Sequence, residues 1–299
     1  MRFASAWHRF WFPPRCAEDL AICRILFAAG MFLVGLSRPI HAWGEVPAFF
    51  HQKARFLRVL DIPIMDTGVL QGMEFVWLAA MVTLAAGWYS RTSAAIVCLG
   101  SLYLFGIDAP EFLGRSVTAG VFVPAILAVS HCGDVLSVDA WRRRRPVINR
   151  PAEEYGWPAR LVCVFLSYVF FAAGLSKIRE TGFPDWMLSD QIARNLLVGH
   201  YWYASRNRAL WPFGAQLLQM YAGAGVLLGV ITQFAELLYP LALFVRAARL
   251  TIVPLMLAIL LGITVTMGPF FHLTLLAHVF WVPWSRVLRR HQAMPLRSA

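Results

Sequence analysis

The sequence predicts an all-α fold: a polytopic helical membrane protein with about eight transmembrane helices, short interfacial helices and both termini in the cytoplasm. Hydrophobic residues make up 59% of the chain, and charged residues make up only 14%. A water-soluble globular protein carries about 25% charged residues, so this chain could not cover a water-facing surface. The apolar residues gather in long runs, and none shows the alternation over about ten residues that is typical of outer-membrane barrels.

Eight apolar runs are candidates for spans, because a helix needs about 20 mostly apolar residues to cross the hydrocarbon core. They are residues 18–37, 71–89, 92–107, 116–133, 160–177, 222–245, 250–267 and 269–284. The third and the eighth are short, so tilted, re-entrant or half-buried placements stay open for both. Residues 1–16 mix Trp, Phe and Arg ahead of a proline pair, which is typical of an amphipathic helix in the headgroup region. We expect an interfacial segment 1–16, one transmembrane domain 17–285 and a basic cytoplasmic tail 286–299.

The arginines and lysines predict the orientation, because cytoplasmic loops carry an excess of both. With the N-terminus inside, the inside segments hold 16 such residues in 67 positions and the outside segments hold 10 in 84. The run "WRRRRP" at 141–146 is the strongest single inside marker, and the long segments 38–70 and 178–214 are then outside. Orientation therefore explains the net charge of +11, and the expected partner is the lipid bilayer, with no nucleic acid.

Other residue patterns give no sign of a metal site or a disulfide framework. The five cysteines form no CxxC pair, and no histidine has the spacing of a metal ligand, so we expect no metal site. His131, His272 and His278 are interpreted as structural. Arg24 lies within the first predicted span, where we expect it to form a structural ion pair, with an acid on another helix as one option.

Lys177 stands out because the chain has only two lysines among its 27 Lys and Arg residues, and this one ends the apolar run "SYVFFAAGLSK". One interpretation is a snorkelling lysine, with its stem in lipid and its ammonium in the headgroups. The other is a base or a cationic anchor inside a helix bundle, because a desolvated lysine can release its proton and an arginine cannot. The small residues just before it would let a second helix approach closely.

Glu236 lies in the middle of a predicted span, with Gln233 three residues before it and Tyr239 three residues after it. This spacing places the three on one helix face. Pro240 is expected to free a backbone carbonyl one turn earlier, near that face. A carboxylate at membrane depth is costly and usually faces the protein interior or a cavity. Glu236 is either a structural partner for an arginine or a backbone donor, or a functional group.

Several motifs, in the same order, resemble the HTTM (horizontally transferred transmembrane) domain, the membrane part shared by vitamin K-dependent gamma-carboxylase and its bacterial relatives. The motifs are "LAICRILFAAG", "AGWYSRTS", "GDVLSVDAW", "AAGLSK", "PDWMLSDQIARNLL", "AELLYPLALF" and "MGPFFHLTLLAHVF". The resemblance covers nearly the whole chain, and the order of the motifs carries more weight than any one of them.

The resemblance implies that Lys177 is a catalytic base, because a lysine after "AG" at a helix end is proposed to deprotonate reduced vitamin K in the carboxylase. It also implies a quinone-like cofactor, for which Trp186, Gln233 and Tyr239 are candidate binding residues, while Glu236 is the candidate partner of the base. The carboxylase has a large lumenal domain for its propeptide, whereas this chain ends about fifteen residues after its last predicted span. We therefore do not expect full glutamate carboxylase activity.

Two functions follow as hypotheses. The first is an enzyme of the bacterial inner membrane, with an outer-leaflet pocket for a quinone-like or lipid-like molecule and with Lys177 as base. The layout "SK…W…ELLYPLALF" is also similar to lipase maturation factors, membrane proteins that help secreted lipases to fold. The alternative is a non-enzymatic maturation factor or chaperone for an exported peptide or protein.

Overall fold

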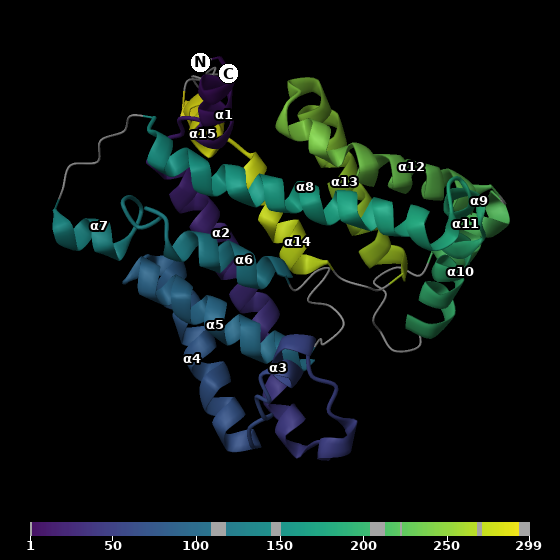
Figure 1. Cartoon of the computed structure of the whole chain (residues 1–299), viewed down its shortest axis with the longest axis horizontal. Coiled ribbons are helices and arrows are strands. Elements are labelled where there is room, and N and C mark those ends of the chain that lie inside the picture. The colour runs from purple at the N-terminus through teal and green to yellow at the C-terminus, as the bar shows by residue number, and fades with distance from the viewer. Residues whose placement is uncertain are drawn as a thin grey trace, which may run out of the picture. The chain divides into compact units, whose positions relative to one another are not determined.

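The computed structural model describes residues 2–108, 118–144, 151–203, 213–221, 223–267 and 271–292 (Figure 1). Every named element in these ranges is a helix, and the strand-like contact between Arg15 and Ala152 is an isolated bridge. The prediction of an all-α fold is thus confirmed for the described part of the chain. Two compact units are present: unit 1 is Met1–Cys163 with Leu276–Ala299, and unit 2 is Val164–Leu275.

Six of the described helices are long and apolar enough to cross a membrane, which supports a multi-pass membrane protein. They are α2 (Ala17–Leu36), α4 (Thr67–Ala86), α5 (Ser90–Asp108), α8 (Glu153–Thr181), α12 (Ala224–Leu238) with the 3₁₀ turn η6 (Tyr239–Leu243), and α13 (Arg246–Met267). The count of eight spans and the sides on which the termini lie stay predictions.

The third, fourth and eighth predicted spans correspond to helices of different lengths. The third predicted span, 92–107, falls within α5, whose 19 residues make it one of the six long helices. The fourth and the eighth contain only shorter apolar helices, which are α6 (Thr118–Ala128) and the stretch His272–Trp281. Residues 109–117 and 268–270, which border these two segments, lie outside the described residues.

Unit 1 is built around α2, α4, α5 and α6, and Figure 1 shows α4, α5 and α6 side by side. Its other helices are α1 (Arg2–Trp11), η1 (Ile40–Glu45), η2 (Ala48–Phe50), α3 (Arg55–Val59), α7 (Val138–Arg143), η7 (His278–Trp281) and α15 (Trp284–Gln292). Trp77 on α4 is buried, its ring packs edge-on against Phe105, and its indole N–H donates to the Ser101 hydroxyl at 2.9 Å. This contact satisfies the polar atom of the largest side chain in the core of the unit.

Polar contacts attach the chain after α2 to the ends of α4 and α5. His41 Nδ1 lies 2.7 Å from a carboxylate oxygen of Glu74, which is buried on α4. Asp108, at the end of α5, accepts hydrogen bonds from Arg38 at 3.0 Å and from the Trp43 indole at 3.1 Å. The predicted outer segment 38–70 is thus ordered by carboxylates of two candidate spans.

Unit 2 contains the second part of α8, which is followed by short helices, α12, η6 and α13. The remaining helices are α9 (Asp185–Leu188), α10 (Gln191–Val198), the π-helical turn η4 (Gly199–Tyr203), α11 (Gly214–Met220) and α14 (His272–Ala277), of which the last continues beyond the unit. Small residues bring the short helices close to α12, because Gly229 lies against the Met187 carbonyl and Gly225 lies against Ala193. Close approach of this kind is typical of helix contacts inside membranes.

The segments expected at the membrane surface contain short helices. Residues 1–16 contain α1, and 178–214 contains α9, α10 and η4, although residues 204–212 of this segment are outside the described residues. The predicted basic tail 286–299 begins within α15, and residues 293–299 are also outside. Placement of these helices on a membrane face, and the division into 1–16, 17–285 and 286–299, stay predictions.

Candidate functional site

Lys177 and Glu236 form a close ion pair within unit 2. The Lys177 Nζ atom lies 2.6 Å from Oε1 and 2.6 Å from Oε2 of Glu236. The Lys177 side chain keeps 22% of its surface exposed and the Glu236 side chain keeps 11%. The ammonium therefore faces a carboxylate on a neighbouring helix, and both charges are largely enclosed by protein.

Packing between α8 and α12 makes this pair possible. A Cβ atom at Gly174 would lie 3.1 Å from the Glu236 Cβ and from a Leu237 methyl group, so a larger residue would press α12 away. The Gln233 side-chain amide donates to the Gly174 carbonyl at 2.8 Å and joins the two helices. Lys177 lies almost one turn after Gly174, which brings its ammonium level with Glu236.

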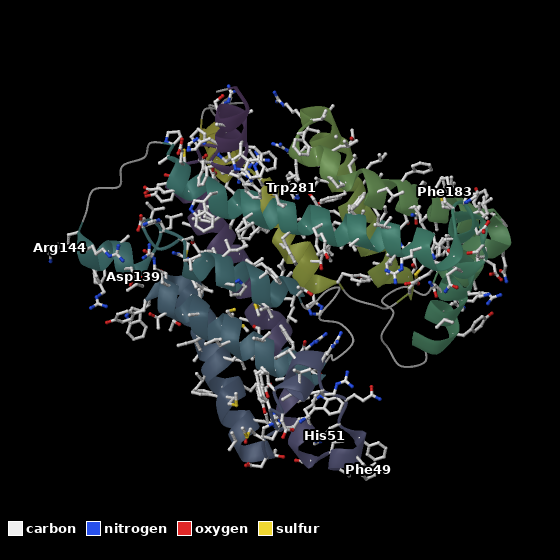
Figure 2. All side chains as sticks on the ribbon, in the orientation of Figure 1. Phe49, His51, Asp139, Arg144, Phe183 and Trp281 are labelled. Carbon is white, nitrogen blue, oxygen red and sulfur yellow. The ribbon has the colours of Figure 1, made fainter. Side chains whose placement is uncertain are left out.

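The turn after α8 brings an aromatic ring to the ammonium. Gly182 has φ of 94°, a conformation that residues with a side chain rarely adopt, and it lets the chain turn directly after Thr181. The Trp186 ring then lies 4.3 Å from the Lys177 Nζ atom, measured to the ring centroid. This is the geometry of a cation–π contact, which attracts the ammonium to the face of the indole. Phe183 marks the same turn in Figure 2.

The predicted shared face of Gln233, Glu236 and Tyr239 is buried. Gln233 and Tyr239 are almost fully enclosed, and the Tyr239 ring packs against Phe170 at 4.6 Å between centroids. The Gln233 Oε1 atom is also buried and has no hydrogen-bond partner among the residues that the structure describes. An acceptor of this kind lies one helical turn from the Glu236 carboxylate.

The pair lies far from the start of α12. Glu236 is twelve residues after Ala224, where α12 begins, which corresponds to about 18 Å along the helix. Lys177 is four residues before the end of α8 at Thr181. Because the two side chains meet, the end of α8 is level with the last turn of α12, and the short helices α9 and α10 flank the first half of α12.

The backbone near Pro240 differs from the sequence-based expectation. Pro240 lacks an N–H group and would leave the Glu236 carbonyl without its helical donor. In the structure α12 ends at Leu238, and the Tyr239 N–H donates to that carbonyl as the chain tightens into η6. The Glu236 backbone carbonyl therefore has a hydrogen-bond donor and is not left free by Pro240.

The geometry gives the site defined chemical properties. Amine and carboxylate can each hold a proton, and the separation of 2.6 Å permits transfer between them. The indole face of Trp186 and the acceptor of Gln233 add one apolar and one polar surface beside the pair. Among the described residues, no three His, Cys, Asp or Glu side chains gather as metal ligands would.

A second buried cation, Arg24 on α2, is held differently. Its guanidinium donates to the carbonyl of Cys132 at 2.6 Å and to the carbonyl of Leu136 at 2.5 Å. The expected ion pair with an acid on another helix is wrong, because among the described residues Arg24 pairs with no carboxylate. The loop after α6 presents its backbone oxygens to the charge instead.

Comparison with known proteins decides the family. A family model described as HTTM domain matches residues 12–283, which is most of the chain. The chain belongs to the HTTM domain family. The match includes Lys177, Glu236 and Trp186 of this HTTM protein. No curated protein and no solved structure matches it.

The sequence alone indicated most residues at the site of this HTTM protein, but it missed two. Phe170, which supports Tyr239, lies seven residues before Lys177, and this two-turn spacing on α8 was an available signal. Gly182 was not singled out, although a glycine directly after a helix is a common stop signal. The histidines 272 and 278 are buried, in agreement with a structural interpretation of both.

Proposed function

We propose that this HTTM protein is a membrane enzyme in which Lys177 acts as a base on a quinone-like or lipid-like molecule, with Glu236 as its partner. The observation that carries the proposal is the contact of 2.6 Å between Lys177 Nζ and both carboxylate oxygens, with the Trp186 ring on another side of the ammonium. A snorkelling lysine would need neither of these partners, since headgroups and water would surround its charge.

The roles of the two side chains follow from proton chemistry. In the working form the Lys177 amine is neutral and takes a proton from an acidic hydroxyl of the bound molecule. The ammonium that results is stabilised by both oxygens of Glu236, which are already in place. The low exposure of both side chains strengthens this electrostatic stabilisation, because little water screens the pair.

The choice of lysine supports a role beyond anchoring. An arginine fork pairs with a carboxylate through two parallel hydrogen bonds and is usually the better structural partner. The chain uses arginine for all but two of its 27 cationic Lys and Arg residues, yet it has lysine at this pair. What lysine offers and arginine lacks is a removable proton.

The variant Lys177→Arg tests the base. We expect it to insert at normal levels and to unfold at nearly the wild-type temperature, but to fail to rescue the cellular phenotype of deleting the gene. Lys53→Arg is the matched control, because Lys53 donates to the carbonyl of Ile62 and pairs with no carboxylate among the described residues, and it should rescue fully. Full rescue by Lys177→Arg would end the base hypothesis.

A maturation factor for an exported peptide or protein is the second candidate. Its support is the row of exposed apolar side chains on the short helices of unit 2. They are Leu188, Leu197, Val198, Tyr201, Met220 and Tyr221. Such a surface suits either a protein client or lipid. Rescue by Lys177→Arg together with loss of function in Leu188→Ser/Val198→Ser would favour this candidate, and a bacterial inner membrane is the expected location for both functions.

A further inference from the structure

A second polar site lies in unit 1, at the turn between α4 and α5. A cavity of about 630 Å³ opens there, and α5 and α7 supply most of its charged lining. The lining includes Ser90, Arg91, Asp139, Arg142 and Arg143. Figure 2 labels Asp139 on α7 and Arg144 directly after this helix. No residue of the Lys177 site lines this cavity.

The carboxylates that line the cavity already interact with other groups of the protein. Asp139 accepts hydrogen bonds from the backbone N–H groups of Tyr89 and Ser90, each at 2.9 Å, and from the Ser90 hydroxyl at 3.0 Å. Partial burial raises the pKa of Asp139, but these hydrogen bonds and the charge of Arg143 outweigh it and hold the pKa below its ordinary value. Its negative charge is thus compensated by the first turn of α5.

Asp134 is engaged in the same way by protein groups. It accepts a hydrogen bond from the Tyr155 hydroxyl at 3.0 Å and lies 3.7 Å from a nitrogen of Arg143. The Arg143 and Asp134 side chains are 56% and 31% exposed, so this pair is loose and screened by water. An incoming anion could therefore draw Arg143 toward the cavity at little cost.

Two further arginines have donors to spare. The Arg91 Nε atom donates to the Ser130 carbonyl at 3.1 Å, which fixes the guanidinium at the rim of the cavity. Arg142 lies over the Tyr89 ring, 5.6 Å from its centroid. Within the described residues, the outer nitrogens of Arg91 and the whole guanidinium of Arg142 donate to no protein acceptor. Several N–H groups of arginines that line the cavity therefore have no acceptor in the described part of the protein.

The cavity lies where lipid headgroups are expected. The turn between α4 and α5, two candidate spans of 20 and 19 residues, must fall at a membrane surface because each helix alone spans about 30 Å. Trp88 and Trp141 are exposed beside it, at 47% and 80%, and exposed tryptophans favour the interface. The charge bias of the sequence predicts that this surface is cytoplasmic, where anionic lipids attract basic residues.

We propose that the cavity binds the phosphate group of an anionic membrane lipid. The paired N–H groups of arginine match phosphate oxygens, and three arginines from α5 and α7 line this one cavity. A lipid is favoured as the source of the phosphate because the cavity lies at the end of two candidate spans, and the exposed tryptophans would contact the acyl chains.

Native mass spectrometry of the full chain, purified in detergent and mixed with equal amounts of phosphatidylglycerol and phosphatidylcholine, tests the proposal. Wild type should retain phosphatidylglycerol preferentially. Arg142→Gln and Arg143→Gln should each lower that retention by about fivefold, which is the effect expected for one arginine at an anionic surface. Arg142→Lys should retain most of it, because the charge remains.

Arg246→Gln is the matched control, since Arg246 is exposed at the start of α13 and does not line the cavity. Thermal unfolding of each variant shows whether it is folded. If Arg142→Gln does not fold, the retention measured for Arg143→Gln tests the proposal in its place. Equal retention by all variants, or an equal loss in Arg246→Gln, would overturn the proposal. Displacement of the lipid by inorganic phosphate or glycerol phosphate at comparable concentration would overturn the lipid as source.

Discussion

Arg24 in unit 1 and Lys177 in unit 2 are both cations within candidate spans, and the protein stabilises them by different means. Arg24 is fully buried and donates to two backbone carbonyls, which are neutral and cannot take up a proton. Lys177 remains partly exposed and pairs with Glu236, which is charged and titratable. In the first arrangement no partner of the cation can take up its proton, whereas the second brings together an amine and a carboxylate that can each hold one.

The comparison separates structural from chemical use of a buried charge. Carbonyl oxygens of the loop 131–137 fix both the position of Arg24 and the path of that loop, so the contact is suited to stability. A lysine–glutamate pair beside a tryptophan is a weaker support for the fold, but it allows proton transfer. Substitution of Arg24 should therefore lower stability more than function. Substitution of Lys177 or Glu236 should lower function more than stability.

The largest effect on stability is expected for Arg24→Leu. The variant leaves the carbonyls of Cys132 and Leu136 without their donor, and each buried unsatisfied group costs about 1–3 kcal/mol. The free energy of unfolding in detergent should fall by about 2–5 kcal/mol, whereas Arg246→Leu should change it little. A loss no larger than that of Arg246→Leu would remove the structural role of Arg24.

Glu236→Gln comes next and should lower the free energy of unfolding by about 1–3 kcal/mol, since Lys177 loses its counter-charge but still reaches solvent. The double variant Lys177→Met/Glu236→Leu should regain most of that stability, because a well-packed apolar pair can replace an ion pair. It should still fail to rescue the deletion phenotype. A double variant that functions would show that this pair is structural, like Arg24.

A smaller effect is expected for Trp186→Leu. It removes the cation–π contact at 4.3 Å, which contributes about 0.5–2 kcal/mol, and leaves the ion pair in place. Unfolding temperature should fall slightly, while function should fall much more if the indole positions the bound molecule. Phe75→Leu, at an exposed aromatic ring on α4 of unit 1, is the control for loss of an exposed ring.

The smallest effect should appear only in acid. The pKa of Asp139 is lower in the folded protein than in the unfolded chain, so its hydrogen bonds stabilise the fold fully above about pH 4 and are lost as the pH falls further. The difference in unfolding temperature between wild type and Asp139→Asn should be constant above that pH and shrink below it. A difference that grows in acid would contradict the lowered pKa.

The sequence predicted the shared face on α12 and singled out Lys177, because both depend on local spacing and composition. It named Glu236 as the candidate partner of Lys177 but could not give their direct contact, since the two are 59 positions apart and the register of α8 on α12 depends on packing at Gly174. The contact with Trp186 was equally hidden, because it requires the turn at Gly182.

The expectation for Arg24 failed for a related physical reason. A buried guanidinium needs acceptors, and carboxylates are the acceptors that a sequence displays. Backbone carbonyls are present at every residue, so the pattern of side chains gives no sign of which loop will supply them. The fourth predicted span contains a described helix, Thr118–Ala128, that is shorter than the apolar run, because such a run does not show where a helix inside it begins or ends.

The short distance within the pair limits how strongly an electric field can act on it. A proton that passes between Lys177 and Glu236 moves less than the 2.6 Å that separate nitrogen from oxygen, and even that separation is less than a tenth of a hydrocarbon core of about 30 Å. Moving a full charge across the membrane changes its energy by about 2.3 kcal/mol per 100 mV, so this step would change by about 0.2 kcal/mol at most. Proton transfer at the site should therefore proceed equally well in energised and depolarised membranes, and an ionophore that collapses the voltage should leave its rate unchanged.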